Sequence, residues 1–178
     1  MLLVVASGVI VSQPINAGCL TIVARGGSAH IHLAAAVSAG RVSIGCTSEA
    51  SVSLTGQALS AQELHFEGGS LRVAAPVRIG NWSARAAGHV VFDSDVTLDG
   101  PGQLGSASVV VSERAKLLLN DEAELMINGD IDVLGSIAVG SRTLLQTRGA
   151  LRLGQSSTLT FAPTKKAAAL TITAQEVV

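Results

Sequence analysis

The stretch LLLNDEAELMINGDIDVLGSIAV, residues 117–139, decides the fold. It contains pairs of apolar residues whose two members are separated by one residue, with turn-forming residues between the pairs: Leu117/Leu119, Leu125/Ile127, Ile131/Val133 and Ile137/Val139. Alternation with period two is typical of a strand that buries one face. The first three pairs therefore predict three short strands, and the fourth pair begins the next set.

The same beat extends on both sides of this stretch. Pairs of this kind recur about every twenty residues, at Val77/Ile79, Val96/Leu98, Leu117/Leu119, Ile137/Val139 and Leu159/Phe161. A repeat of this length with three strands describes one coil of a solenoid. We therefore predict an all-β fold, a right-handed parallel β-helix with three short strands per coil of about twenty residues and about seven or eight coils.

Earlier and later strands follow from the same pattern. They are expected at Leu20–Ala24, His30–Leu33, Val42–Ile44, Val52–Leu54, Leu64–Phe66, Leu71–Val73, Val90–Phe92, Val109–Val111, Leu145, Leu151/Leu153 and Leu170–Ile172. Gly and Asn-Gly breakers separate them. An antiparallel sandwich is the alternative, but its strands commonly have about five or six residues and need no regular beat.

Composition narrows the function classes. Apolar residues make up 48% of the 178-residue chain, and the charged fraction is only 14%. A formal net charge of −1 gives no reason to expect nucleic acid, which is bound through Lys and Arg on phosphates. The apolar residues are mainly aliphatic, which suits a narrow core of stacked side chains.

The amino-terminal segment allows two interpretations. Residues 1–19 are largely apolar and end in Ala17-Gly18-Cys19, similar to a lipoprotein signal, but no cation precedes the apolar run. We favour first strands over a degenerate signal, and the run is too short to span a bilayer, so no membrane insertion is expected. Residues 20–178 form the predicted solenoid. Cys19 and Cys46 match no CxxC motif, and whether they pair stays open.

Segments near the middle of the chain resemble a known class of proteins. Leu64-His-Phe-Glu-Gly-Gly69, Val96-Thr-Leu-Asp-Gly100 and Ile131-Asp-Val-Leu-Gly135 resemble the repetitive β-helical stalks of autotransporter passengers and filamentous-haemagglutinin-type adhesins. The resemblance is one of pattern and covers roughly residues 60–165. It implies a secreted or cell-surface structural role.

Two acidic groups are the best candidates for chemistry. Asp93 and Asp95, followed by Asp99, would point outward if Phe92 points inward. Such carboxylates could bind Ca²⁺ or act as an acid and base, but a solvated turn corner is the simpler interpretation. Asp121, Glu122 and Glu124 form a second acidic corner with the same alternatives.

Other motifs are weaker candidates for a functional site. His30 and His32 could share a face as metal ligands, but no third ligand is near in sequence. Ser106, Ser108 and Ser112 are expected on the strand and turn surface, and Thr158/Thr160 and Thr171/Thr173 are expected to be ordinary strand residues. Gly100–Gly105 has a GxGxxG outline that Pro101 interrupts. Asn81-Trp82-Ser83 is a formal glycosylation sequon.

Aromatic residues bear on the enzyme alternative. Pectate-lyase-like β-helix enzymes act on polysaccharides, and sugar sites commonly offer aromatic platforms. Phe66, Phe92 and Phe161 fall at inward positions, which leaves only Trp82 outside. We therefore expect no enzyme, and assign no catalytic, cofactor-binding or metal residues.

The sequence thus favours a non-enzymatic structural or adhesive β-helix segment of an extracellular or cell-surface protein. An intracellular bactofilin-like self-assembling scaffold is the other alternative. Both chain ends are apolar, so we expect end-to-end self-association or neighbouring coils, with a host or glycan surface as a further partner. Leu119→Asp is expected to unfold or aggregate the rod, and Asp121→Ala to be nearly silent.

Overall fold

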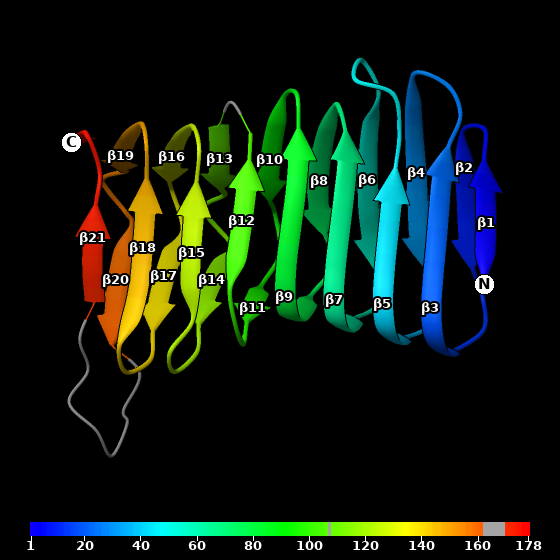
Figure 1. Cartoon of the computed structure of the whole chain (residues 1–178), viewed down its shortest axis with the longest axis horizontal. Coiled ribbons are helices and arrows are strands. Elements are labelled where there is room, and N and C mark those ends of the chain that lie inside the picture. The colour runs from blue at the N-terminus through cyan, green and yellow to red at the C-terminus, as the bar shows by residue number, and fades with distance from the viewer. Residues whose placement is uncertain (107, 162–169) are drawn as a thin grey trace.

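The chain folds into a right-handed parallel β-solenoid of about 8 turns, with about 21 residues in each turn. The structure is a computed structural model, and it describes residues 1–106, 108–161 and 170–178. Two parallel sheets face each other, and the chain alternates between them as it advances along the rod (Figure 1). The predicted fold class is confirmed.

Within the described residues, the larger sheet has 13 strands and the smaller has nine. The larger sheet contains β1 (Leu2–Val5), β3 (Ile15–Ala24), β5 (Val37–Gly45), β7 (Leu59–Gly68), β9 (Val77–Ala86), β11 (Val96–Leu98), β12 (Gly102–Gly105), β14 (Lys116–Leu119), β15 (Glu124–Ile127), β17 (Ser136–Val139), β18 (Thr143–Thr147), β20 (Thr158–Phe161) and β21 (Leu170–Thr173). The smaller sheet contains β2 (Gly8–Val11), β4 (Ser28–Leu33), β6 (Ser51–Gly56), β8 (Ser70–Ala74), β10 (His89–Phe92), β13 (Ser108–Val111), β16 (Asp130–Val133), β19 (Ala150–Leu153) and β22 (Glu176–Val177).

The amino-terminal half departs from the predicted three strands per coil. Strands β3, β5, β7 and β9 have nine or ten residues each, and each joins one predicted strand to a second inward-facing stretch that was not predicted. In β5, Val37 and Ala39 are buried and then Val42 and Ile44, so the alternation slips by one residue at the bend near Gly40. The predicted short strand Val42–Ile44 is therefore the second half of a bent, continuous strand.

From β11 onward the predicted three-strand coil is found. Pro101 lies between β11 and β12, and its carbonyl accepts the N–H of Trp82 in the preceding coil. Proline has no N–H to donate into a ladder, so the strand divides there. In the following coils Asn120–Ala123 and Gly140–Arg142 keep the two strands apart.

The core is a set of inward ladders that run the length of the rod. One ladder joins Ile22, Ile44, Phe66, Ala84 and Leu104 in successive coils, and all five are buried. The one small residue, Ala84, follows the large Phe66, so the ring and the methyl group share the space between neighbouring coils.

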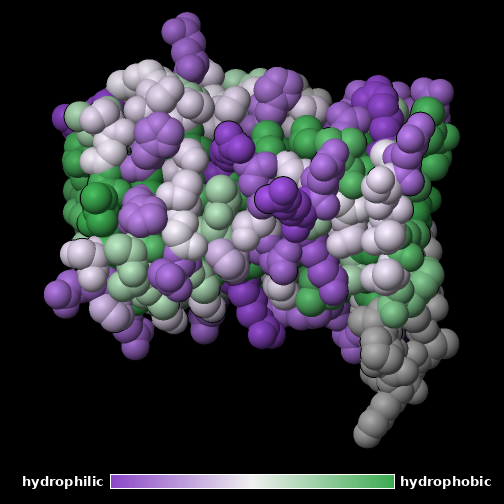
Figure 2. Space-filling view, turned by 180° about the vertical axis from the view of Figure 1, so that it is seen from behind, coloured by the Kyte–Doolittle hydropathy of each residue, from purple (hydrophilic) through white to green (hydrophobic). Residues whose placement is uncertain are grey.

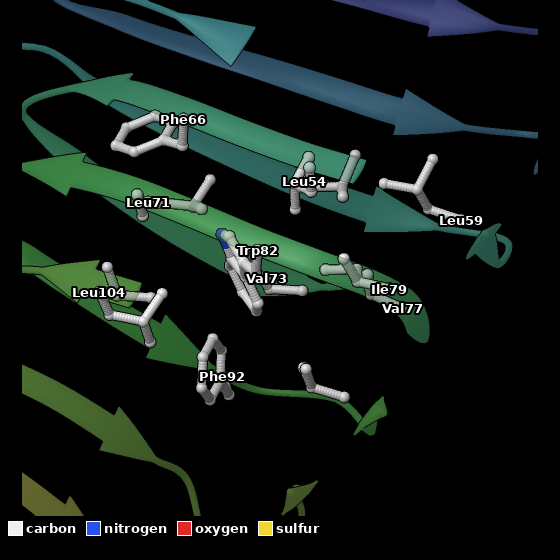
Figure 3. Packing of buried hydrophobic residues seen from close by; sticks show 14 of the residues in the cluster. Leu54, Leu59, Phe66, Leu71, Val73, Val77, Ile79, Trp82, Phe92 and Leu104 are labelled. Atoms are coloured by element: carbon white, nitrogen blue, oxygen red, sulfur yellow. The ribbon is translucent and has the colours of Figure 1, made fainter. Parts of the chain in front are cut away.

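Trp82 belongs to this core, so its expected outward position is wrong. The slip at Gly80–Asn81 reverses the alternation that runs from Ile79, and Trp82 is only 3% exposed. Its ring centroid lies 5.3 Å from that of Phe92, with the two ring planes tilted by 44°, and the two residues are neighbours in the core in Figure 3. In the next coil Gly102 is in register with Trp82, and a Cβ there would lie 2.9 Å from Leu98 Cδ2 and 3.0 Å from Leu125 Cδ1, so the missing side chain leaves room for these two leucines.

Phe66 and Phe92 point inward as predicted, whereas Phe161 is 54% exposed. Phe161 is in register with buried Val139, so its direction follows the ladder. However, β20 pairs only with β17 among the described strands, so no strand covers the other side of Phe161. The prediction for Phe161 is therefore correct in register and wrong in burial.

Candidate functional site

A polar groove lies on the outer face of β9, β12, β15 and β18, which face the viewer in Figure 1. Its floor is one outward ladder: Ser83, Gln103, Met126 and Gln146 are in register across four coils. Its volume is about 360 Å³. Two amides and a hydroxyl therefore line up along the rod and offer donors and acceptors to a bound molecule.

A second outward ladder forms one wall of the groove. Arg85 is in register with Gly105. The ladder continues because the N–H of Asn128 donates to the Leu104 carbonyl and that of Arg148 to the Ile127 carbonyl. Gly105 adds no side chain to this wall, and a Cβ there would lie 3.3 Å from the Ala84 carbonyl oxygen and 3.5 Å from the Asn128 side-chain nitrogen. The hollow opens at this missing side chain.

The arginines that line this groove differ from most others in the chain. Five arginines elsewhere hold carboxylates in ion pairs, namely Arg41, Arg72, Arg78, Arg142 and Arg152. The Arg85 and Arg148 side chains are exposed and form neither an ion pair nor a hydrogen bond with any described residue. No Asp or Glu lines the hollow. Its electrostatic character is therefore positive.

A neighbouring hollow of about 590 Å³ shares Ser83 and Gln103 with the groove. Its charges are balanced, because Arg41 Nε lies 2.6 Å from Glu63 Oε2. Here hydrogen bonding with Glu63 and its charge raise the pKa of Arg41. The groove thus continues along the rod into a region where the cation already has a partner.

The structure separates the first acidic candidates rather than clustering them. Asp93 accepts hydrogen bonds from Arg72 and Ser112, and Asp99 accepts them from Arg78 and Asn120. Each carboxylate therefore bridges the coils before and after its own. Asp95 is exposed and accepts the backbone N–H of Lys116 at 3.1 Å.

These contacts determine the titration of the carboxyls. Partial burial raises the pKa of Asp93, but hydrogen bonds from Ser112 and Arg72 outweigh it, and the net pKa lies below the ordinary value. The hydrogen bond from Arg78 is the main cause that lowers the pKa of Asp99. The turn-corner interpretation therefore holds in part: these are corner residues, but they tie coils together.

The second acidic corner behaves in the same way. Asp121 Oδ1 accepts the N–H of Ser141 at 2.7 Å, and Glu122 pairs with Arg142 at 2.6 Å. Glu124 is exposed. Because Asp121 makes this bond, we now expect Asp121→Ala to cost about 1 kcal/mol rather than to be nearly silent.

The histidines and serines are dispersed along the rod. His30 and His32 are exposed on β4, and His32 Nδ1 lies 3.1 Å from Thr55 Oγ1. Ser108 contacts His89 at 2.6 Å, and Ser112 bonds to Asp93. Ser106 is 6% exposed, and its hydroxyl has no partner among the described residues, so its expected surface position is wrong. Within the described residues, no three His, Cys, Asp or Glu gather as metal ligands would.

The remaining motifs are placed as follows. Cys19 is exposed and Cys46 half-buried, and both are free thiols. Asn81 of the sequon is exposed within β9, and Gly102–Gly105 is strand β12, not a phosphate loop. Thr158/Thr160 and Thr171/Thr173 lie on strands β20 and β21, which are not neighbours in the sheet. Of the chain that the structure describes, no part forms a helix long and apolar enough to cross a membrane.

No protein family matches this chain, and no curated protein or solved structure shows significant similarity to it. The β-solenoid class therefore stands on the structure alone. The resemblance to autotransporter and haemagglutinin stalks stays a prediction from the sequence pattern.

Proposed function

We propose that this protein is a non-enzymatic structural and adhesive rod segment of an extracellular or cell-surface protein. The observation that carries the proposal is the open strand edges at both ends of the described rod. Strand β1 pairs only with β3, and β20, β21 and β22 each have a single described neighbour. A rod with such edges is suited to continuation by further parallel strands, from neighbouring coils or a second copy.

The side chains at the open edges support this role. Leu2, Val4 and Ile10 are exposed by 54–69%, and at the other end Leu159, Ile172 and Val177 are exposed by 39–61%. In Figure 2 green residues lie at both ends of the rod, and purple residues spread across the middle. Exposed apolar side chains beside unpaired strands favour association.

The backbone of β1 gives a means of testing the edge directly. The Met1 carbonyl accepts the N–H of Thr21 in β3, and the Val5 carbonyl accepts the N–H of Arg25, which directly follows β3. Because alternate residues of a strand bond to opposite neighbours, the N–H and C=O of Leu2 and Val4 point to the open edge. Val4→Pro would remove an open-edge donor while leaving the bonds of β1 to β3 in place.

Sedimentation velocity at tens of micromolar would test the proposal. We expect the wild-type chain to form species larger than a monomer, Val4→Pro to reduce them, and Val4→Thr, which keeps the N–H, to reduce them less. A wild-type chain that sediments as a stable monomer would contradict the proposal.

A further inference from the structure

We propose that the groove over β9, β12, β15 and β18 binds an extended polysaccharide that bears oxyanions, either carboxylate or sulfate groups. This inference rests on the proposed adhesive role, and it names the ligand class and the residues. The groove is the strongest candidate because its charge and its hydrogen-bonding groups point to the same chemistry.

The charge comes from two guanidinium groups without partners. Arg85 and Arg148 are exposed, line the same hollow and make no ion pair within the described residues. Arginine pairs with planar oxyanions through two parallel hydrogen bonds. An anionic group is therefore the missing partner that this groove would accept.

The spacing of the two arginines calls for an extended ligand. Arg85, Gly105, Asn128 and Arg148 occupy successive rungs of one ladder. Three strand spacings of about 4.8 Å place the Arg85 and Arg148 backbones about 14 Å apart. A linear chain laid along the rod can present one anionic group to each guanidinium over this distance, whereas a single small anion would meet both only if the two side chains converged on it.

The rest of the lining favours sugars over other polyanions. Between the arginines, Gln103, Asn128 and Gln146 present side-chain amides, which both donate and accept hydrogen bonds. Sugar hydroxyls need such mixed partners. No aromatic residue lines this hollow, so neither bases nor sugar rings can stack there, and recognition would rest on hydrogen bonds and charge.

Two neighbouring carboxylates oppose anion binding, and one of them, Glu124, lies two residues before Met126 on the outer face of β15. The other, Glu67, precedes Arg85 in the ladder, and its carboxylate lies 3.9 Å from His65 Nε2. It forms no ion pair with Arg85 within the described residues. Its charge weakens the attraction of the groove for an anion, which makes Glu67 a useful position for a test.

The experiment measures binding of the full chain to alginate, which bears carboxylates, and to dextran sulfate, with uncharged dextran as the matched neutral polymer. We expect alginate, dextran sulfate or both to bind, and dextran not to bind. The relative affinity for the two anionic polymers identifies which oxyanion the groove prefers. Poly-dT is included to detect nucleic-acid binding.

Variants connect the binding to the groove. Arg85→Ala and Arg148→Ala are each expected to weaken binding about tenfold. Glu67→Gln is expected to tighten it or leave it unchanged. Arg114→Ala is the matched control, because Arg114 is also exposed and forms no ion pair with any described residue, but lies in the turn before β14. Circular dichroism verifies that each variant retains the strand signal.

Three results would overturn the proposal. They are no binding to either anionic polymer, an equal loss with Arg114→Ala, and binding of poly-dT at least as tight as that of the polysaccharides. The sedimentation experiment on β1 measures association at the end of the rod and does not involve the groove. The two experiments therefore distinguish failure of the polysaccharide-binding proposal from failure of the rod proposal.

Discussion

The coils that contain β3 to β9 and those that begin at β11 differ in how the chain turns the corner within the larger sheet. In the first region the larger sheet turns a corner within a strand, at Gly18, Gly40, Gln62 and Gly80, and the backbone stays paired on both sides. In the second region Asp99–Pro101 and later turns interrupt the strand. A corner of one unpaired residue, glycine in three coils and Gln62 in the fourth, thus keeps the strand continuous, whereas a turn of three or four residues divides it.

The two regions also differ in how they reach the left-handed backbone conformation. The first uses glycine, at Gly26 with φ 129° and Gly56 with φ 99°. The second uses Glu122 with φ 64° and Arg142 with φ 53°. In this left-handed conformation the Cβ of a non-glycine residue is sterically unfavourable, which raises the free energy of the folded state, whereas glycine has no such penalty.

The largest effect is expected from a charge in the core of the second region. Leu119 is 0% exposed in the ladder between Leu98 and Val139. Leu119→Asp places an unpaired carboxylate in an apolar stack, at a cost of more than about 5 kcal/mol, comparable to the stability of a whole domain. We expect loss of the native strand signal and of cooperative melting in circular dichroism.

Thr97→Asp is the control for Leu119→Asp, because Thr97 lies on the outward side of neighbouring β11. It is expected to retain the fold. If Leu119→Asp melted like the wild type, the inward register of the second region would be wrong.

A second test concerns the turns of the first region. A Cβ on Gly56 would lie 2.3 Å from the Leu33 carbonyl oxygen, and its positive φ adds strain. Gly56→Ala is expected to lower the free energy of unfolding by about 2 kcal/mol or more in urea denaturation.

Gly45→Ala is the matched substitution, because a Cβ there meets nothing within 4 Å. It is expected to change the free energy of unfolding by less than about 1 kcal/mol. Equal effects at the two glycines would show that the close approach at Gly56 does not limit the turn.

Much of this organisation can be predicted from the sequence, and the exceptions have physical causes. The inward pairs of β14 to β17 were predictable because turn residues isolate each pair. Trp82 was not, because one slipped residue at the Gly80–Asn81 corner reverses the side to which every later residue of β9 points.

The groove could not be predicted from the sequence, also because its residues come together only through the register between coils. Arg85 and Arg148 are far apart in the chain, and only the register between coils brings them to one ladder. The common signal is their position, since each directly follows an inward residue near the end of a strand, Ala84 and Thr147. That signal has meaning only once the coil boundaries are known.

A third test measures how the free energy of unfolding depends on pH, because the carboxylates of Asp93 and Asp99 join the two regions. Asp93 and Asp99 bond to arginines in the coil of β8 and β9, and their folded-state pKa values are lowered. Their contribution is therefore present above the unfolded pKa of about 3.9 and is lost as pH falls through the lower folded pKa. Stability should decline below about pH 4 in urea denaturation.

The variant Asp99→Asn isolates one of these carboxylates. It cannot titrate, so the loss of stability between pH 6 and pH 3 should be smaller than in the wild type. A pH dependence identical to that of the wild type would mean that Asp99 contributes no linkage.

The smallest effect is expected at the left-handed turn of the second region. Glu122→Gly removes an exposed ion pair with Arg142, worth about 0–1 kcal/mol, and relieves a left-handed conformation that costs about 1–2 kcal/mol. Glycine also gains freedom in the unfolded chain, which offsets part of the relief. The free energy of unfolding should therefore stay within about 1 kcal/mol of the wild type. Glu122→Ala loses the same ion pair and keeps the strained φ, so it should be the less stable of the two variants. If Glu122→Ala were at least as stable as Glu122→Gly, the left-handed backbone at this turn would carry no measurable cost, and the contrast with the glycine turns of the first region would not be energetic.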